Sequence, residues 1–431
     1  MSVIHNITAK KNIAIIVFLL FQPVLLIIIT GKPQFSTLSV INFFDEVIFA
    51  IMLVLLANNV FKYGMERKDL YILAFYIFYS SFLIIINGLP LISFGQIFIT
   101  GKFFIIYYYF LYLPNQYKQK TLFSLYRALL IIFYLSIIFA IVQLIFPEIQ
   151  ERIFLKTEES RGLFGRGSNS FFSSRVIYAE FICIFIILTI SLIPKLAIIK
   201  RYNKRLLTLK WLIGLGYFML LVTASRKETI FAFIIIPFIL LLMSKIKYKY
   251  LLLPILTIFF ILFSATFIVV FQDINSIAFS ETYIRYIIFL KSTEIFQAYF
   301  PFGSGPGTFG STMSMYYTNV YEAFNVGENI LGNEATGRRG PIYDLFLVTF
   351  FAEYGLGGIF LFIFMYVVWK RDCFEWENYF YFINPKIIIN ILPVMLIVFS
   401  IMVPMFGNAI GYLIFMIFGI LHIDKRKKKF S

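Results

Sequence analysis

Long apolar runs dominate the sequence, and their length constrains the fold more than any other feature. About twelve stretches are candidate membrane spans, because a helix that crosses the hydrocarbon core needs roughly 20 mostly apolar residues. These stretches are 13–30, 40–61, 70–88, 94–113, 123–146, 174–193, 209–224, 229–244, 250–271, 343–369, 387–404 and 407–422. The sequence therefore predicts an all-α polytopic membrane protein, with residues 1–431 forming a single integral membrane domain.

Composition favours the same class. Hydrophobic residues make up 60% of the 431 residues and charged residues only 14%, whereas a soluble domain is about half apolar and about a quarter charged. No small-residue cleavage pattern follows the first run, so we interpret it as a span and not as a cleavable signal peptide. The two cysteines predict no disulfide framework, and no His/Cys/Asp cluster has metal-ligand spacing.

Basic residues are unevenly shared among the loops that join the predicted spans. One alternating set of loops is rich in Lys and Arg, and the opposite short loops hold far fewer. Because cytoplasmic loops carry the excess of these residues, the pattern predicts that both termini lie in the cytoplasm. The net charge of +16 and the basic tail at 424–430 then indicate contact with anionic membrane lipids, and no nucleic-acid partner is needed.

Two predicted outer segments are longer than the other connections. The first spans 147–173, and the second spans 272–342, roughly 70 residues. Within the second, residues 281–300 place apolar side chains at helical spacing, which predicts an amphipathic helix at the membrane interface.

The stretch PFGSGPGTFG, residues 301–310, has the G-x-G-x-x-G spacing of a nucleotide loop. Such a loop requires a strand before the glycines and a helix N-terminus after them. Here the preceding segment is predicted to be a helix, no Walker-type lysine is present, and the segment is predicted to face outward. We therefore interpret it as a turn in which glycine supplies positive φ.

Arginine collects on the predicted outer side, although insertion favours cations inside. Its planar and permanently charged guanidinium suits phosphate oxygens. The outer arginines together therefore predict an anionic ligand. For each single arginine the alternative is a salt bridge at the rim to Glu158, Glu159, Glu281 or Glu334. The outer arginines are Arg152, Arg161, Arg166, Arg175, Arg226, Arg285, Arg338 and Arg339.

Four ionisable residues lie within predicted spans or at their ends: Lys102, Glu180, Asp344 and Glu353. Ionisable groups inside a membrane are costly and usually face a cavity or one another. They are candidates for substrate binding or acid–base chemistry. The alternatives are a structural pair or snorkelling for Lys102 and Glu180, and a helix N-cap for Asp344.

The order of motifs over about 220–365 resembles the O-antigen polymerase and ligase superfamily. SRKETIFAF (225–233) is followed by Arg285, by PFGSGPGTFG, by a polar loop and by YDLFLVTFFAEYGLGGIFLF (343–362). The ligase branch places a His where Asp344 stands, and the Asn that often follows is Leu345 here. The chain holds only His5 and His422, both at predicted cytoplasmic ends. The resemblance therefore favours the polymerase branch.

This resemblance implies a glycosyltransferase of the bacterial inner membrane that uses no cofactor. It transfers a growing glycan from polyprenyl diphosphate to a lipid-linked repeat unit on the outer, periplasmic face. The implied partners are a polyprenyl-diphosphate-linked oligosaccharide, membrane lipids and a separate chain-length regulator. A ligase, and a transporter or flippase of lipid-linked oligosaccharide, are the alternatives.

Within this scheme, Arg226 and Arg285 hold the diphosphate and stabilise the charge that grows on the leaving oxygen. Asp344 is the first candidate for a general base that accepts the proton of the acceptor hydroxyl. We expect no metal, because the outer arginines repel a divalent ion. The remaining substrate-binding candidates are Arg161, Arg166, Arg175, Arg338, Arg339, Lys102, Glu180 and Glu353.

Overall fold

The computed structural model describes residues 44–113, 115–146, 168, 170–172, 174–197, 203–243, 284–326, 346–374, 383–400 and 409–422. Within these ranges the regular structure is helical. Six of the described helices are long and apolar enough to cross a membrane. They are α3 (Arg67–Ile86), α4 (Ser93–Leu111), α5 (Asn115–Ile145), α7 (Arg175–Ala197), α8 (Asn203–Thr223) and α15 (Phe346–Phe374).

The remaining predicted spans fall into three groups. Three of them match shorter apolar helices, which are α2 (Phe44–Tyr63), α16 (Pro385–Ser400) and α17 (Ala409–Leu421). The run 229–244 is divided into α9 (Arg226–Ile230), a π-helical turn (Phe231–Ile235) and α10 (Ile236–Met243). The runs 13–30 and 250–271 lie outside the described residues. A membrane-embedded helical chain is thus confirmed, and the total of twelve spans stays a prediction.

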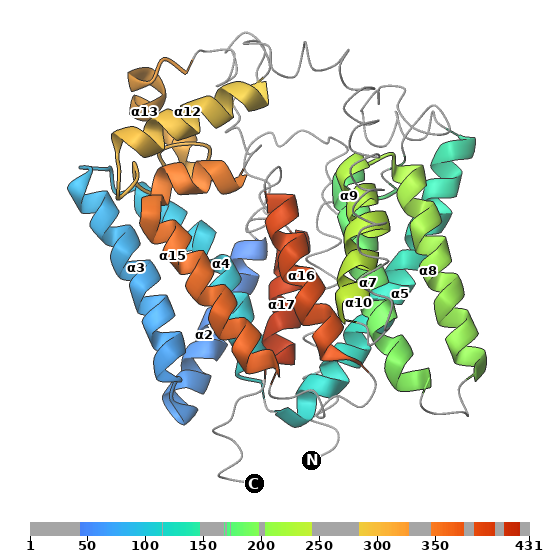
Figure 1. Cartoon of the computed structure of the whole chain (residues 1–431). Helices are drawn as coiled ribbons and strands as arrows, with labels where there is room; N and C mark the ends of the chain where they lie inside the picture. The colour runs from blue at the N-terminus through green and yellow to red at the C-terminus, as the bar shows by residue number, and fades with distance from the viewer. Residues whose placement is uncertain are drawn as a thin grey trace.

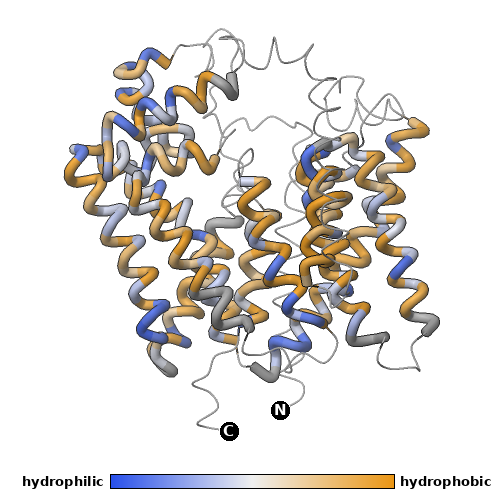
Figure 2. The backbone as a smooth tube through the Cα atoms, in the orientation of Figure 1, coloured by the Kyte–Doolittle hydropathy of each residue, from blue (hydrophilic) through white to orange (hydrophobic). Residues whose placement is uncertain are grey.

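The helices stand side by side in one bundle (Figure 1). One side of the bundle consists of α2, α3, α4 and α15. The other side consists of α5, α7, α8, α9 and α10, and α16 and α17 lie between the two sides. Long, continuously buried stretches are 103–111 of α4, 178–188 of α7 and 410–421 of α17. Figure 2 shows apolar residues along the middles of the helices and hydrophilic residues mainly near their two ends, the pattern that a membrane-spanning bundle requires.

Lys118, near the start of α5, bonds to the ends of two other helices. Its ammonium donates to the carbonyl oxygen of Leu111 at 2.7 Å, after which α4 ends, and to that of His422, just beyond α17. The Tyr107 hydroxyl lies 2.5 Å from Nδ1 of the same His422. The last carbonyls of a helix lack intrahelical partners and carry the negative end of its dipole, so a buried cation there satisfies both helices at once.

At the opposite end, part of the predicted outer loop 272–342 forms a cap on the bundle (Figure 1). It contains α12 (Ile284–Ala298), the turn at 301–310, a 3₁₀ helix (Thr312–Tyr316) and α13 (Asn319–Ala323). The apolar face of α12, with Ile288 and Ile295, packs on Phe309, Tyr321 and Ala352. The helix predicted over 281–300 is therefore confirmed, while its position at the membrane interface stays a prediction.

The helix α15 is broken near its start. Gly355 has φ 55° and ψ −146°, which no α-helical residue adopts. Figure 1 shows the first piece lying across the top of the bundle and the longer piece running down through it. The predicted span 343–369 is thus two helical pieces, and Glu353 lies on the first of them.

Candidate functional site

The stretch 301–310, which we call the glycine turn, follows α12 directly. Gly303, Gly305, Gly307 and Gly310 have φ of 86°, 97°, 81° and 69°. All four lie in the left-handed region, where glycine pays no penalty because it has no Cβ. The prediction that these glycines supply positive φ is confirmed.

The amides of the glycine turn converge on the carboxylate of Glu353. Thr308 N–H and Phe309 N–H donate to Glu353 Oε1 at 2.8 and 2.9 Å, and the Ser311 hydroxyl donates to the same oxygen at 2.6 Å. The side chain is buried, with the residue only 2% exposed. Successive amides in a turn form a concavity that binds anions. The spacing that is typical of a phosphate loop here binds the chain's own carboxylate.

The backbone of the glycine turn fits into the break of α15. Ser304 N–H and Gly305 N–H donate to the carbonyls of Ala352 and Glu353 at 3.0 and 2.8 Å. Leu356 N–H donates back to the Pro301 carbonyl at 2.9 Å. A Cβ on Gly355 would lie 2.3 Å from the Pro301 carbonyl oxygen. The turn thus satisfies backbone groups that the break leaves without helical partners.

Side chains of α3 and α4 fix this unit to the bundle. The Tyr79 hydroxyl lies 3.0 Å from the Phe302 carbonyl oxygen and 2.9 Å from that of Tyr354. Gln96 Oε1 accepts from Met313 N–H at 3.1 Å. The glycine turn and the start of α15 are therefore hydrogen-bonded to each other and to α3, and the segment after the turn is hydrogen-bonded to α4.

A second polar group, which we call the α7–α9 charge cluster, consists of Glu180, Lys227 and Glu228. Lys227 Nζ lies 3.2 Å from Glu228 Oε1 and 3.8 Å from Glu180 Oε1. Ser225 donates from its hydroxyl to Glu228 Oε2. Both carboxylate side chains are 0% exposed, and Lys227 also stands 5.4 Å from the ring centre of Phe399.

The structure places two predicted diphosphate ligands beside this cluster. Arg226 is the first residue of α9, next to Lys227, and Arg175 is the first residue of α7, one and a half turns before Glu180. Arg175 is half-buried and forms no ion pair with any carboxylate in the described ranges. Arg285 is the second residue of α12. The side chains of Arg226 and Arg285 lie outside what the structure describes.

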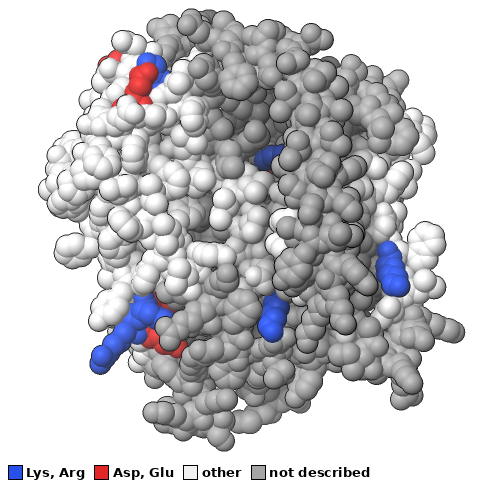
Figure 3. Space-filling model, viewed as in Figure 1, with Lys and Arg blue, Asp and Glu red and all other residues white. Residues whose placement is uncertain are grey.

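Several other candidates lie outside the described residues altogether. These are Asp344, Arg161, Arg166, Arg338 and Arg339, together with the glutamates expected to form rim salt bridges. Figure 3 shows that the described part of the viewed face is mostly uncharged, with its Lys, Arg, Asp and Glu side chains in separate patches.

Lys102 belongs to a different environment. It lies on α4, only 4% exposed, with its Nζ 5.0 Å from the ring centre of Phe49 on α2. A cation over an aromatic face is attracted by the ring quadrupole. Glu180 pairs with Lys227, as the cluster shows, and so the two in-span residues Lys102 and Glu180 have separate partners.

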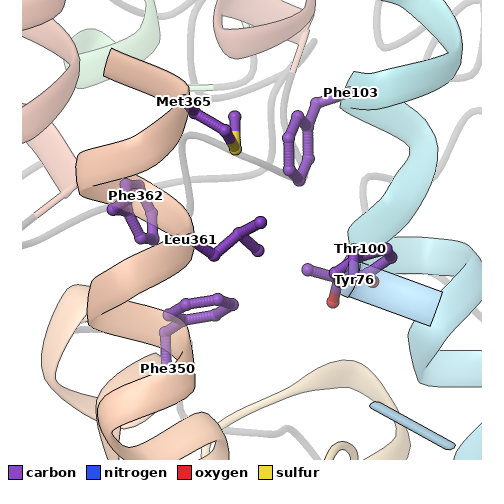
Figure 4. Close-up of a pocket in the computed structure, with 7 residues that line it drawn as sticks. All are labelled: Tyr76, Thr100, Phe103, Phe350, Leu361, Phe362 and Met365. Carbon is purple, nitrogen blue, oxygen red and sulfur yellow. The ribbon is translucent and has the colours of Figure 1, made fainter. Parts of the chain in front are cut away.

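A small cavity lies between α3, α4 and α15 (Figure 4). Its volume is about 10 Å³, enough for roughly one water molecule. Its walls are mostly apolar, and they are made by Tyr76, Thr100, Phe103, Phe350, Leu361, Phe362 and Met365. It has no room for a sugar or a phosphate.

Sequence reasoning did not single out Lys227, Glu228 or Ser225. The sequence feature that could have indicated these residues is the polar run Ser225–Glu228 directly before an apolar stretch. Ser225 and Glu228 have the spacing of a capping box. In the structure the Ser225 hydroxyl bonds to the Glu228 carboxylate instead of capping the helix backbone.

No family model matches this chain, and no curated protein matches it.

Proposed function

We propose that this chain is a glycan polymerase of the bacterial inner membrane. It transfers a growing glycan from polyprenyl diphosphate to a lipid-linked repeat unit at the outer face. The observation that carries this proposal is that motifs separated in the sequence lie at the same end of the bundle (Figure 1). Three motifs lie at this end: the Ser-Arg-Lys-Glu stretch at the start of α9, the helix α12 with Arg285, and the glycine turn bound to Glu353.

In this proposal the arginines at the helix starts bind the diphosphate. Arg226 and Arg175 begin α9 and α7, which pack against each other, and Arg285 lies near the start of α12. A helix N-terminus adds its own partial positive charge for an anion, most clearly in the long helix α7. Fixed cations in a partly dry site stabilise charge that develops on a leaving oxygen more strongly than water does.

The transfer itself then follows ordinary substitution chemistry. The acceptor hydroxyl attacks the anomeric carbon of the growing chain, the bond from that carbon to the diphosphate oxygen breaks, and polyprenyl diphosphate leaves. The hydroxyl proton passes to a base, for which Asp344 is the proposed group. Asp344 stands two residues before α15, whose start is held by the glycine turn through Glu353. The carboxylate of Glu353 already accepts three hydrogen bonds, which favours Asp344 over Glu353 as the base.

We further propose that the end with α12 faces the periplasm and that the end with Lys118 and His422 faces the cytoplasm, with both termini cytoplasmic. Basic residues near the starts of α3, α5 and α16 support this orientation through the positive-inside rule; they are Arg67, Lys68, Lys118, Lys120 and Lys386. A separate chain-length regulator is the expected protein partner.

The decisive test uses the purified protein in lipid nanodiscs with one substrate, the polyprenyl-diphosphate-linked repeat unit. A polymerase should produce a ladder of longer lipid-linked glycans. A product that forms only when a lipid A-core acceptor is added would show a ligase and contradict the proposal. Movement of intact substrate across a vesicle membrane without any new glycosidic bond would show a transporter.

A further inference from the structure

The α7–α9 charge cluster carries one more acidic group than basic group. It contains two carboxylates and one ammonium, with both carboxylates 0% exposed. Among the described side chains, Lys227 is the only cation that forms an ion pair with either of them. With both carboxylates ionised, the buried cluster would carry a net charge of −1.

The two carboxylates are not equivalent. Glu228 lies nearer the shared lysine, at 3.2 Å against 3.8 Å for Glu180, and it also accepts the hydroxyl of Ser225. Within the described part of the chain, neither oxygen of Glu180 has a hydrogen-bond partner. Glu228 is therefore the better compensated anion, and Glu180 is the surplus one.

Among the side chains that the structure describes, those from the elements packed around Glu180 supply no second compensating charge. Cys183 lies one turn further along α7, and its thiol donates to the Glu228 carbonyl at 3.6 Å. From α8, the Tyr217 hydroxyl donates to the Ala232 carbonyl at 3.0 Å. From α16, the ring of Phe399 faces Lys227. Thiols and phenols are neutral near neutral pH, so these groups leave the surplus negative charge in place.

An uncompensated buried carboxylate is so costly that it takes up a cation or a proton. We propose that the α7–α9 charge cluster is a proton-binding site in which Glu180 carries the proton. The ligand is the smallest cation, and Lys227, whose side chain is 21% exposed, lies between the site and the surface. This inference rests on the geometry of the cluster and is independent of the proposed polymerase activity.

Protonation has a consequence for the neighbouring arginines. With Glu180 neutral and Glu228 paired with Lys227, the cluster has no net charge. It therefore adds no negative charge at the start of α9, where Arg226 stands next to Lys227 in the sequence.

Infrared spectroscopy of the purified protein in lipid nanodiscs tests this directly. A protonated carboxylic acid has a carbonyl stretch that is separate from the amide bands and shifts in D₂O. We expect this band in the wild type near neutral pH and expect Glu180→Gln to remove it. Glu294→Gln is the matched control: Glu294 is 49% exposed and paired with Lys291, so its loss should leave the band unchanged.

Two further variants test the charge count. Glu228→Gln leaves one carboxylate and one lysine, so Glu180 should ionise and the band should disappear although Glu180 is present. Lys227→Met leaves two carboxylates without a cation, so the band should grow. This opposite pair of results is not expected from general damage to the fold.

Three outcomes would overturn the proposal. A wild-type spectrum without the band would mean that another cation neutralises Glu180. A band that survives Glu180→Gln would belong to a different acid. A band that is lost when sodium replaces choline at constant pH would show that the site takes a metal cation instead of a proton.

Discussion

Two buried glutamates, Glu353 and Glu180, illustrate how the surroundings of a side chain determine its role. Glu353 accepts three hydrogen bonds through one oxygen and holds the glycine turn on α15. Glu180 accepts no hydrogen bond from any described residue and shares a lysine with Glu228. Both are acidic residues in apolar stretches of the sequence, and that context alone predicts the same functional role for each. The donors that distinguish them come from segments distant in the chain.

We expect Glu353→Ala to destabilise the protein by about 3 kcal/mol or more, because it leaves buried amide donors without an acceptor and hydrogen bonds to a charged group are worth about 1.5–3 kcal/mol each. Glu353→Gln keeps an acceptor oxygen and should cost less. Thermal unfolding in detergent measures both, with Glu294→Ala as the exposed control. A wild-type unfolding temperature together with lost activity would instead place Glu353 in the chemistry.

We expect Arg226→Ala to lower the rate of glycan lengthening by about 10²–10³-fold, the range observed when one electrostatic donor to a developing anion is removed. Arg226→Lys keeps the charge but loses the planar fork, and should recover only part of that rate. The lengthening assay with purified protein measures both. Lys120→Ala is the control, since Lys120 is an exposed cation near the start of α5, far from α9. Full-length product from Arg226→Ala at wild-type rate would remove Arg226 from the proposed site.

At the scale of elements, the glycine turn and the break in α15 form one hydrogen-bonded unit. The turn follows α12, and its positive-φ glycines allow the backbone to lie against Ala352 and Glu353. The turn itself was predictable from its glycines. The break at Gly355 was not, because the sequence around it is apolar and continuous with a span. The Pro301 carbonyl, which lies against Gly355 and accepts from Leu356 N–H, comes from a segment distant in the chain.

We therefore expect Gly355→Ala to reduce the free energy of unfolding by at least about 2 kcal/mol. A left-handed conformation costs an L residue roughly 1–2 kcal/mol, and the added Cβ would lie 2.3 Å from the Pro301 carbonyl oxygen. Gly214→Ala is the matched control on α8, where a Cβ would meet nothing within 4 Å. In water alanine stabilises a helix by about 1 kcal/mol relative to glycine, so this variant should be neutral or slightly more stable.

Thermal unfolding of the two alanine variants, side by side, separates the local clash from the general effect of replacing glycine. If Gly355→Ala unfolded at the wild-type temperature, the backbone contact between the turn and α15 would not contribute to stability.

At the scale of the whole molecule, the bundle separates two chemically different ends. The basic starts of α3, α5 and α16 and the hydrogen bonds of Lys118 lie at one end. The glycine turn and the α7–α9 charge cluster lie at the other. The apolar runs predicted most of the described helices, because a membrane demands long apolar stretches with satisfied backbones. The cluster could not be predicted in the same way, since Glu180 and Lys227 meet only after α7 and α9 pack.

We expect cysteines introduced at the two ends of the bundle to be labelled from opposite sides of the membrane. In a Cys373→Ser background, Glu294→Cys on α12 should react with a membrane-impermeant maleimide in intact spheroplasts. Lys120→Cys near the start of α5 should react only after permeabilisation. Cys183 is 0% exposed and should stay unreacted in both variants. The reverse labelling pattern would invert the proposed orientation and place the arginines in the cytoplasm.

The hydrogen bonds of Lys118 also bear on the order in which the helices can pack during synthesis and membrane insertion. Lys118 is synthesised early, while the His422 carbonyl that accepts from it follows some three hundred residues later. Until α17 has been inserted beside α4, the hydrogen bond from Lys118 to the His422 carbonyl cannot form, and the connection between α4 and α5 lacks that support. The early helices of this protein therefore depend on a late one for their final packing, and a chain shortened before α17 should be cleared by the cell's proteases even though the residues of the glycine turn are intact.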